Sequence, residues 1–260
     1  MEHFTCGLSL DGNKEMHNLN RCNSFDNIDL DFFVKNYPTQ PVKMTVSPDS
    51  LPWLFQGVKF LHEIGFQISN NLAYGIDWSD ETNLAILNAQ LSLLIEYYLK
   101  NPNVKPCSLL DESIAPLAYY SPNTQCKFEK HCGAGINMVT YDVNGIPYPC
   151  QLFMPLSVGN RAKRMGDIYF PEYVPIRSLN DDCQDCIVNS LCSFCYGSNY
   201  KERNNIYSHD KNLCRYNKLL IKARAFFKAK QYILGQLSVD KNEEQAILRS
   251  IKIIQENLVL

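Results

Sequence analysis

The sequence predicts an α/β fold, followed by a small cysteine-rich α+β region and two C-terminal helices. Three observations lead to this prediction. Strand and helix patterns alternate over the first hundred residues, which is typical of a parallel sheet with helical crossovers. Eight of the eleven cysteines lie between Cys126 and Cys214. The residues after Cys214 contain two stretches in which apolar side chains recur at helical spacing.

The N-terminal region is expected to consist of short buried strands and amphipathic helices. The expected order is strand 6–10, strand 42–46, helix 54–64, strand 66–74 and helix 80–100. Gly65 follows the first helix, at a position where a left-handed residue commonly ends a helix. Ser79 or Asp80 is a suitable cap for the second helix, because its side-chain oxygen accepts a hydrogen bond from the first turn. This order predicts a parallel sheet with helical crossovers.

The middle of the chain is predicted to be a loop followed by a β-hairpin. Residues 101–125 contain four prolines and little periodicity, which indicates a linker or an ordered loop. Strands at 136–141 and 146–153 are expected to join at Asn144-Gly145, because both residues tolerate positive φ.

Two C-terminal helices are predicted over 216–234 and 243–258, and Asp240 is a suitable cap for the second. Their apolar stripes are expected to pack on the domain itself. The alternative is that they form a docking face for a partner protein.

The bulk composition argues against several classes of protein. The net charge is −2, and no run of Lys or Arg forms the basic stripe of a nucleic-acid-binding protein. No apolar segment approaches the ~20 residues needed to span a bilayer. The N-terminal residues lack the charged and apolar regions of a signal peptide. We therefore expect a cytoplasmic protein that binds neither nucleic acid nor membrane.

The cysteines are the most informative feature of the sequence. Clustered thiols in a reducing cytosol indicate metal binding or redox chemistry rather than disulfides. Cys6, Cys22 and Cys107 are isolated and are expected to pack as small apolar side chains. The other eight form the series Cys126-x5-Cys132, Cys150, Cys183-x2-Cys186-x5-Cys192-x2-Cys195 and Cys214.

Eight thiolates match the requirement of two four-iron clusters, in which each iron takes one cysteine. Two zinc sites with four cysteines each are the chemical alternative. The spacing favours iron–sulfur clusters, because no histidine falls at ligand spacing within the series. The upstream Gly145-x4-Cys150 hairpin is also not a feature of zinc ribbons.

The segment from Cys126 to Cys214 resembles a SPASM domain, the auxiliary-cluster domain of radical SAM enzymes. The family pattern is a Cys, a Gly-x4-Cys, a gap, a Cys-x2-Cys-x5-Cys-x3-Cys and a final Cys. This sequence also has the upstream Cys found in members with two fully ligated clusters. Further matches are Asp142-x2-Gly145-x2-Tyr148-Pro149-Cys150 and Met165-Gly166-Asp167-Ile168. The resemblance covers about ninety residues.

The resemblance implies two auxiliary 4Fe-4S clusters. The first set of ligands would be Cys126, Cys132, Cys150 and Cys195, and the second set would be Cys183, Cys186, Cys192 and Cys214. The family often has three residues between the last two cysteines of the tight run, where this chain has two. Gln151 occupies the position of the Asp base in anaerobic sulfatase-maturating enzymes, and a neutral amide accepts no proton at working pH. We therefore do not expect sulfatase maturation by that route, and the sequence identifies no catalytic residue.

The segment Ser9-Leu10-Asp11-Gly12 resembles part of the barrel of the same enzymes. It corresponds to the fourth strand, and Ser9 and Arg21 match positions near bound S-adenosylmethionine. The 260 residues contain no CxxxCxxC, the loop that holds the catalytic cluster in this family. We therefore expect S-adenosylmethionine and a third 4Fe-4S cluster only in an intact enzyme, and we expect this truncated chain to be inactive alone.

The sequence thus predicts four regions and one leading function. The regions are the C-terminal part of a TIM-like radical SAM barrel (1–105), a linker (106–125), an iron–sulfur domain (126–214) and C-terminal helices (215–260). The resemblance implies a maturase with a peptide or protein substrate, whose missing half-barrel is either part of the same gene or a separate chain. The alternatives are a non-catalytic iron–sulfur electron-transfer or scaffold subunit and a zinc-stabilised binding module.

Overall fold

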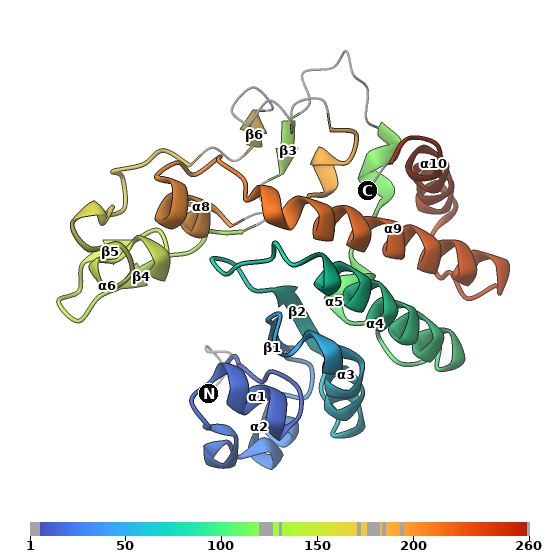
Figure 1. The fold of residues 1–260 in the computed structure, drawn as a ribbon, viewed down its shortest axis with the longest axis horizontal. Coiled ribbons are helices and arrows are strands. Elements are labelled where there is room, and N and C mark those ends of the chain that lie inside the picture. The colour runs from blue at the N-terminus through green and yellow to red at the C-terminus, as the bar shows by residue number, and fades with distance from the viewer. Residues whose placement is uncertain are drawn as a thin grey trace.

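The structure is a computed structural model that describes residues 6–119, 127–129, 132–170, 173–175, 183, 186–192 and 195–258. Figure 1 shows a mixed α/β arrangement that is crossed by a long helix, α9 (Lys211–Ile233). The N-terminal α/β unit lies on one side of α9, and α10 (Lys241–Asn257) lies on the other. The described residues form three two-stranded sheets and no closed barrel.

Three parallel extended segments form the centre of the N-terminal unit. β1 (Val42–Val46) pairs with β2 (Ile68–Leu72), and α3 (Leu54–Glu63) lies between them in the chain. On the other side of β1, residues 8–10 lie parallel and exchange backbone hydrogen bonds of 2.9 and 2.8 Å with Lys43. A parallel arrangement with a helical connection is therefore present, as the alternating pattern predicts.

Of the three strands predicted in this unit, one is confirmed and two are shorter than expected. The strand predicted over 42–46 is confirmed residue for residue. The strand predicted over 66–74 begins only at Ile68, because Gly65 (φ 99°) is still turning the chain out of α3. The strand predicted at 6–10 forms a single bridge, between Ser9 and Lys43.

The two faces of this sheet differ in character. Met44 and Val46 point to the helix-covered side and are fully buried. Ser9, Lys43 and Ser69 are register partners, so they lie side by side on the opposite face. There Lys43 Nζ donates a hydrogen bond to Ser69 Oγ at 2.8 Å. Parallel sheets are usually covered on both faces, whereas this polar face is partly exposed in the described part of the chain.

Helix α4 (Glu81–Lys100) packs against α3 and α9. Asp80 caps it, because Oδ1 of Asp80 accepts a hydrogen bond from Thr82 N at 2.9 Å, which confirms one of the two predicted caps. Its buried residues are Leu87, Gln90, Leu91, Leu94, Ile95 and Tyr98. The other helices of this unit are α1 (Lys14–Asn20), η1 (Phe25–Asn27), α2 (Leu30–Asn36) and η2 (Leu51–Trp53).

The stretch expected to be a linker has defined contacts in its described part. It contains α5 (Ser108–Asp111) and the 3-10 helix η3 (Ala115–Tyr119). Ser108 Oγ accepts a hydrogen bond from Asn70 N at 2.8 Å and donates one to Asn70 O at 2.6 Å, so it satisfies backbone groups of β2. Since α5 also contacts α9, this stretch connects the sheet to the C-terminal helices.

The cysteine-rich lobe contains two small antiparallel sheets. β3 (Lys127–Glu129) pairs with β6 (Tyr173–Pro175), and β4 (Thr140–Tyr141) pairs with β5 (Pro147–Tyr148). Gly145 has a φ of 75° between β4 and β5, as the predicted hairpin turn requires. Only two residues pair on each of β4 and β5, because the prolines of the return segment donate no backbone hydrogen bond. The strands predicted over 136–141 and 146–153 are therefore wrong in length, and Gln151–Phe153 forms a 3-10 helix instead of strand.

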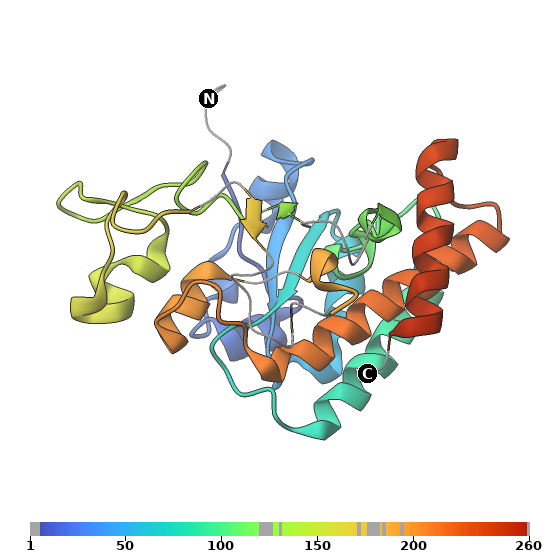
Figure 2. The same ribbon diagram turned by 90° about the horizontal axis from the view of Figure 1, so that it is seen from above.

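Short helices and aromatic packing complete the lobe. The helices are η4 (Gln151–Phe153), α6 (Pro155–Val158), η5 (Gly159–Arg161), η7 (Asn189–Leu191) and α8 (Tyr196–Arg203). The ring of Phe153 stacks on that of Tyr200 with centroids 5.2 Å apart and meets Phe170 edge-on at 5.6 Å. Figure 2 shows that the part of this lobe around α6 (yellow-green) projects on one side of β1 and β2, while α10 (red) lies on the other side.

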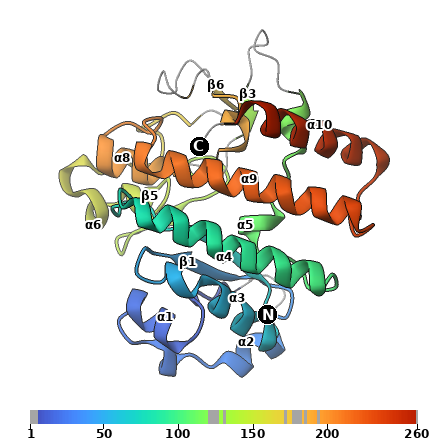
Figure 3. The ribbon, with the colours of Figure 1, turned by 45° about the vertical axis from the view of Figure 1, so that its right-hand side comes forward.

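Both C-terminal helices pack on the domain, as predicted. Figure 3 shows α9 between α4 and α10, and the core beneath α10 includes Ile221, Ile247 and Ile254. Helix α9 begins earlier than predicted, because Asp210 caps it by accepting a hydrogen bond from Asn212 N at 2.9 Å. Asp240 caps α10, as expected. No described helix combines the length and the apolar character that a membrane span requires.

Candidate metal centre

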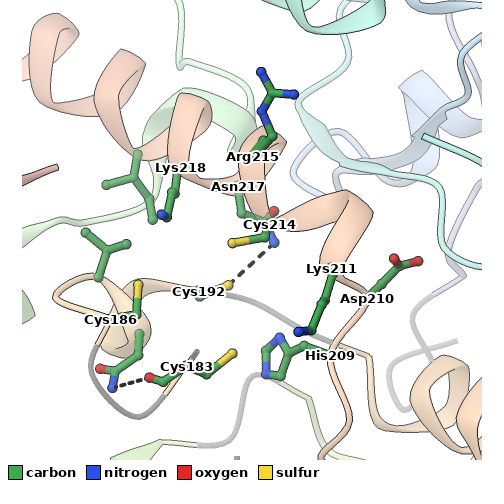
Figure 4. A pocket seen from close by; sticks show the side chains of 13 residues that line it. Cys183, Cys186, Cys192, His209, Asp210, Lys211, Cys214, Arg215, Asn217 and Lys218 are labelled. Atoms are coloured by element: carbon green, nitrogen blue, oxygen red, sulfur yellow. Dashed lines mark hydrogen bonds between the residues drawn. The ribbon is translucent and has the colours of Figure 1, made fainter. Parts of the chain in front are cut away.

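All four cysteines of the second set line one cavity of about 270 Å³. Figure 4 shows them around this cavity, with Cys214 on α9 and the other three on the loop that surrounds η7. Residues Cys214, Asn217, Lys218 and Ile221 follow the i, i+3, i+4, i+7 spacing of one helix face, so this face of α9 forms a wall of the cavity. The loop and the helix are distant in sequence and meet only in the folded chain.

The loop is held in shape by its own backbone and by Asn189. Cys186 N donates to Cys183 O at 3.3 Å, and Cys192 N donates to Asn189 O at 3.2 Å. The buried side chain of Asn189 donates from Nδ2 to Cys183 O at 3.1 Å. These bonds close two successive turns and direct the cysteines of the loop toward one space.

The electrostatics of the cavity oppose four free thiolates. The pKa of Cys192 is raised to about 12, mainly by burial and also by the nearby thiols of Cys214, Cys186 and Cys183. Four thiolates together are therefore costly unless a metal neutralises them. Lys211 and Lys218 also line the cavity and add positive charge. The donor set and its surroundings fit an iron–sulfur cluster.

The described members of the first set form a separate group. The pKa of Cys150 is raised to about 11, mainly by burial and also by the nearby Cys195 and Cys132. Burial also raises the pKa of Cys195, with a further contribution from Cys132. Cys126 lies outside the described residues. The seven described candidates therefore divide into three and four, along the same line as the two sets that the family resemblance implies.

The start of α8 positions Cys195. Cys195 is the N-cap residue, and its Sγ accepts a hydrogen bond from Ser198 N at 3.4 Å. The positive end of a helix favours a thiolate at this position. Cys214 lies in the first turn of α9, so each set has one cysteine at a helix N-terminus.

Gly197 allows α8 to approach Cys150 closely. A Cβ atom at this position would lie 2.6 Å from Leu152 Cβ and 3.2 Å from Cys150 Sγ. The Gly197 position after Cys195 and Tyr196 is thus explained by packing, because any larger residue must displace Leu152 and press on Cys150.

Gly197→Ala is expected to destabilise the first set selectively. Overpacking of this kind costs about 1–3 kcal/mol, and we expect the thermal unfolding temperature and the iron content to fall together. Both can be measured on anaerobically purified protein. Gly7→Ala is the matched control, because a Cβ there meets nothing within 4 Å and should leave both values unchanged. Full iron content and unchanged unfolding in Gly197→Ala would contradict this role.

The other matching residues stabilise the hairpin before Cys150. Asp142 Oδ1 accepts hydrogen bonds from Asn144 N and Ile146 N, each at 2.9 Å, and this interaction fixes the turn. Met165 N donates to Pro147 O at 3.0 Å. The Met165–Ile168 segment therefore lies against the return strand that leads to Cys150.

In the described part of the chain, no three or more His, Cys, Asp or Glu side chains are arranged to hold a metal ion, and this includes the described cysteines of both sets. No disulfide joins two of the described cysteines. Cys107, predicted to pack as a small apolar residue, is fully buried, whereas Cys6 and Cys22 are exposed, so that prediction is wrong for these two.

The two candidates for S-adenosylmethionine contact lie near the sheet. Arg21 forms a two-pronged ion pair with the buried Asp11, with distances of 2.7 and 3.2 Å from Nε and Nη2. Asp11 Oδ1 also accepts a hydrogen bond from Thr45 N at 2.7 Å. Ser9 is exposed beside Lys43. Arg21 thus has a structural partner that the sequence pattern did not reveal.

Sequence reasoning missed Asn217 and Asn189, which contact the second set. The sequence could have indicated Asn217 only through its spacing. It follows Cys214 by three residues, which places both on one helix face.

No protein-family model matches this chain, and no curated protein matches it significantly.

Proposed function

We propose that this chain is an iron–sulfur protein of the radical SAM/SPASM type and that it binds two auxiliary 4Fe-4S clusters. The observation that carries the proposal is the grouping of the described cysteines. Cys192 and Cys195 are neighbours in sequence, yet Cys192 groups with the second set and Cys195 with Cys132 and Cys150. Cysteines that serve only as small core residues have no reason to divide in this way.

The number of cysteines at the cavity supports a four-iron cluster. All four cysteines of the second set are among the residues that line a cavity of about 270 Å³. A four-iron cluster takes one cysteine for each iron. A tetrahedral zinc site with four cysteines would use the same ligands, so metal and sulfide analysis separates the two.

In the proposed holoprotein, the chain's residues hold the clusters and control their surroundings. The thiolates of each set would bind iron, and bound clusters supply one-electron transfer. Lys211 and Lys218 balance negative charge at the second set, while Asn189 holds the loop that carries three of its cysteines. The buried aromatic residues around Cys150 limit the access of water to that cysteine.

A wider role is proposed for the N-terminal unit. The parallel order of its segments and the polar face that carries Ser9 and Lys43 support a position inside a larger TIM-like barrel. In an intact enzyme, Ser9 and Arg21 would lie near S-adenosylmethionine, and the substrate would be a peptide or protein in the cytoplasm. A non-catalytic electron-transfer or scaffold subunit is the second candidate, favoured by the lack of CxxxCxxC in these 260 residues.

Metal analysis tests the proposal directly. After anaerobic purification and reconstitution with iron and sulfide, we expect about eight iron and eight sulfide per chain. Iron, zinc and acid-labile sulfide are measured on the same sample. Stoichiometric zinc without sulfide would contradict the iron–sulfur proposal and favour a zinc-stabilised binding module.

A further inference from the structure

Asn217 lies at the wall of the cavity that holds the second set. It is on the same face of α9 as Cys214, one turn further along the helix. Its side chain is directed across the cavity to the loop, as Figure 4 shows. Asn217 therefore connects the helix that carries one cysteine to the loop that carries the other three.

The contact that Asn217 makes is with a sulfur atom. Its Nδ2 donates a hydrogen bond to Cys192 Sγ at 3.5 Å. An amide N–H is a donor in every state of the site, because the side chain does not titrate. The partner is a partly buried cysteine that lines the cavity with three others, so this bond acts where negative charge would accumulate.

Reduction of an iron–sulfur cluster adds one negative charge, part of which resides on the sulfurs. A hydrogen bond to a ligand sulfur stabilises the reduced form more than the oxidised form. On this basis, which rests on the proposed function, we propose that Asn217 raises the reduction potential of the cluster bound by the second set. Asn217 acts through Cys192 and is therefore a positioning residue.

The positive residues of the cavity act in the same direction but less specifically. Lys211 and Lys218 line the same space, and their charge also favours a reduced cluster. Their effect acts over a longer range and weakens with salt. The short-range bond from Asn217 persists at high salt, which separates the two contributions experimentally.

The test is a redox titration of the full-length holoprotein, followed by electron paramagnetic resonance in 0.5 M salt. Asn217→Leu removes the donor at similar volume, and we expect the reduction equilibrium of one cluster to weaken by up to about tenfold, or about 59 mV for one electron. The potential of the other cluster should not move. Asn217→Gln keeps an amide donor and should restore most of the potential.

Two further variants keep the test decisive. Asn217→Asp keeps the shape but replaces the donor by a negative carboxylate, so its potential should lie below that of Asn217→Leu. Asn212→Leu is the matched control, because Asn212 is an exposed residue of the same helix that does not line this cavity. It should behave as the unmodified chain does.

Equal potentials in the unmodified, Leu, Gln and Asp chains would overturn the role of Asn217, even with both clusters assembled. A shift in both clusters by the same amount would also overturn it, because that result indicates a general change of structure. Failure of the unmodified chain to assemble clusters would instead contradict the proposed function, and the iron and sulfide analysis detects that outcome separately.

Discussion

Cys192→Ala is expected to remove about half of the iron from the reconstituted chain, and Cys195→Ala is expected to remove the other half. The two residues are three positions apart in sequence. Cys192 nevertheless shares a cavity with the rest of the second set, whereas Cys195 lies with Cys132 and Cys150. Each substitution should therefore prevent assembly of a different cluster.

Double variants give the sharpest form of this prediction. Cys192→Ala with Cys214→Ala affects one set twice, so about four iron should remain. Cys192→Ala with Cys195→Ala affects both sets, so almost none should remain. Iron and sulfide content, with the absorbance of the clusters, are measured after identical anaerobic reconstitution. Cys6→Ala is the control, because Cys6 is exposed and belongs to neither set.

The grouping would be wrong if Cys192→Ala and Cys195→Ala removed the same cluster. In that case, their double variant would retain about as much iron as either single variant. Full retention of iron in both single variants would show that neither cysteine is a ligand. Circular dichroism of each variant separates loss of a cluster from loss of the fold.

Glu112→Gln is expected to lower the free energy of unfolding by about 2 kcal/mol, more than usual for a half-exposed carboxylate. Its partner, Arg224, is almost fully buried on α9, and the two side chains are 2.7 Å apart. Burial lowers the pKa of Arg224, and the charge of Glu112 opposes that shift. In Glu112→Gln, the buried guanidinium of Arg224 loses its counter-charge. Its remaining contact is the hydrogen bond that Nε donates to Leu109 O at 2.9 Å.

Urea unfolding of the holoprotein, followed by circular dichroism under anaerobic conditions, measures this effect. Glu256→Gln is the matched control, since Glu256 pairs with Lys252 at 3.9 Å on the exposed side of α10. That change should stay within about 0.5 kcal/mol. In an Arg224→Met background, Glu112→Gln should cost little, because the buried charge is gone. An equal cost in both backgrounds would show that the ion pair does not carry the effect.

Several local features could be predicted because their causes lie within a few consecutive residues. β1 follows from alternation over 42–46, and the start of α4 follows from Asp80 as a cap. The turn at Gly145 follows from its tolerance of positive φ. Packing of the C-terminal helices follows from their apolar stripes.

Other features could not be predicted, because they depend on contacts between distant segments. The segment at 6–10 pairs only around Ser9, although its composition resembles a full strand. Residues 106–119 have linker-like composition, yet Ser108 bonds to β2 and Glu112 to α9. Nothing in the sequence around Arg21 indicates that its side chain forms an ion pair with Asp11.

The cysteines also have some properties that the sequence determines and others that depend on the tertiary structure. The sequence by itself determined the number and the spacing of the cysteines, because these are properties of the linear chain. Eight thiolates at this spacing were enough to make two four-iron clusters the leading hypothesis. Only the tertiary structure decided which described cysteines lie together and that Asn217 contacts Cys192. The physical reason is that α8 and α9 each bring a helix N-terminus to a different part of the lobe, and the path between them is set by packing rather than by local pattern.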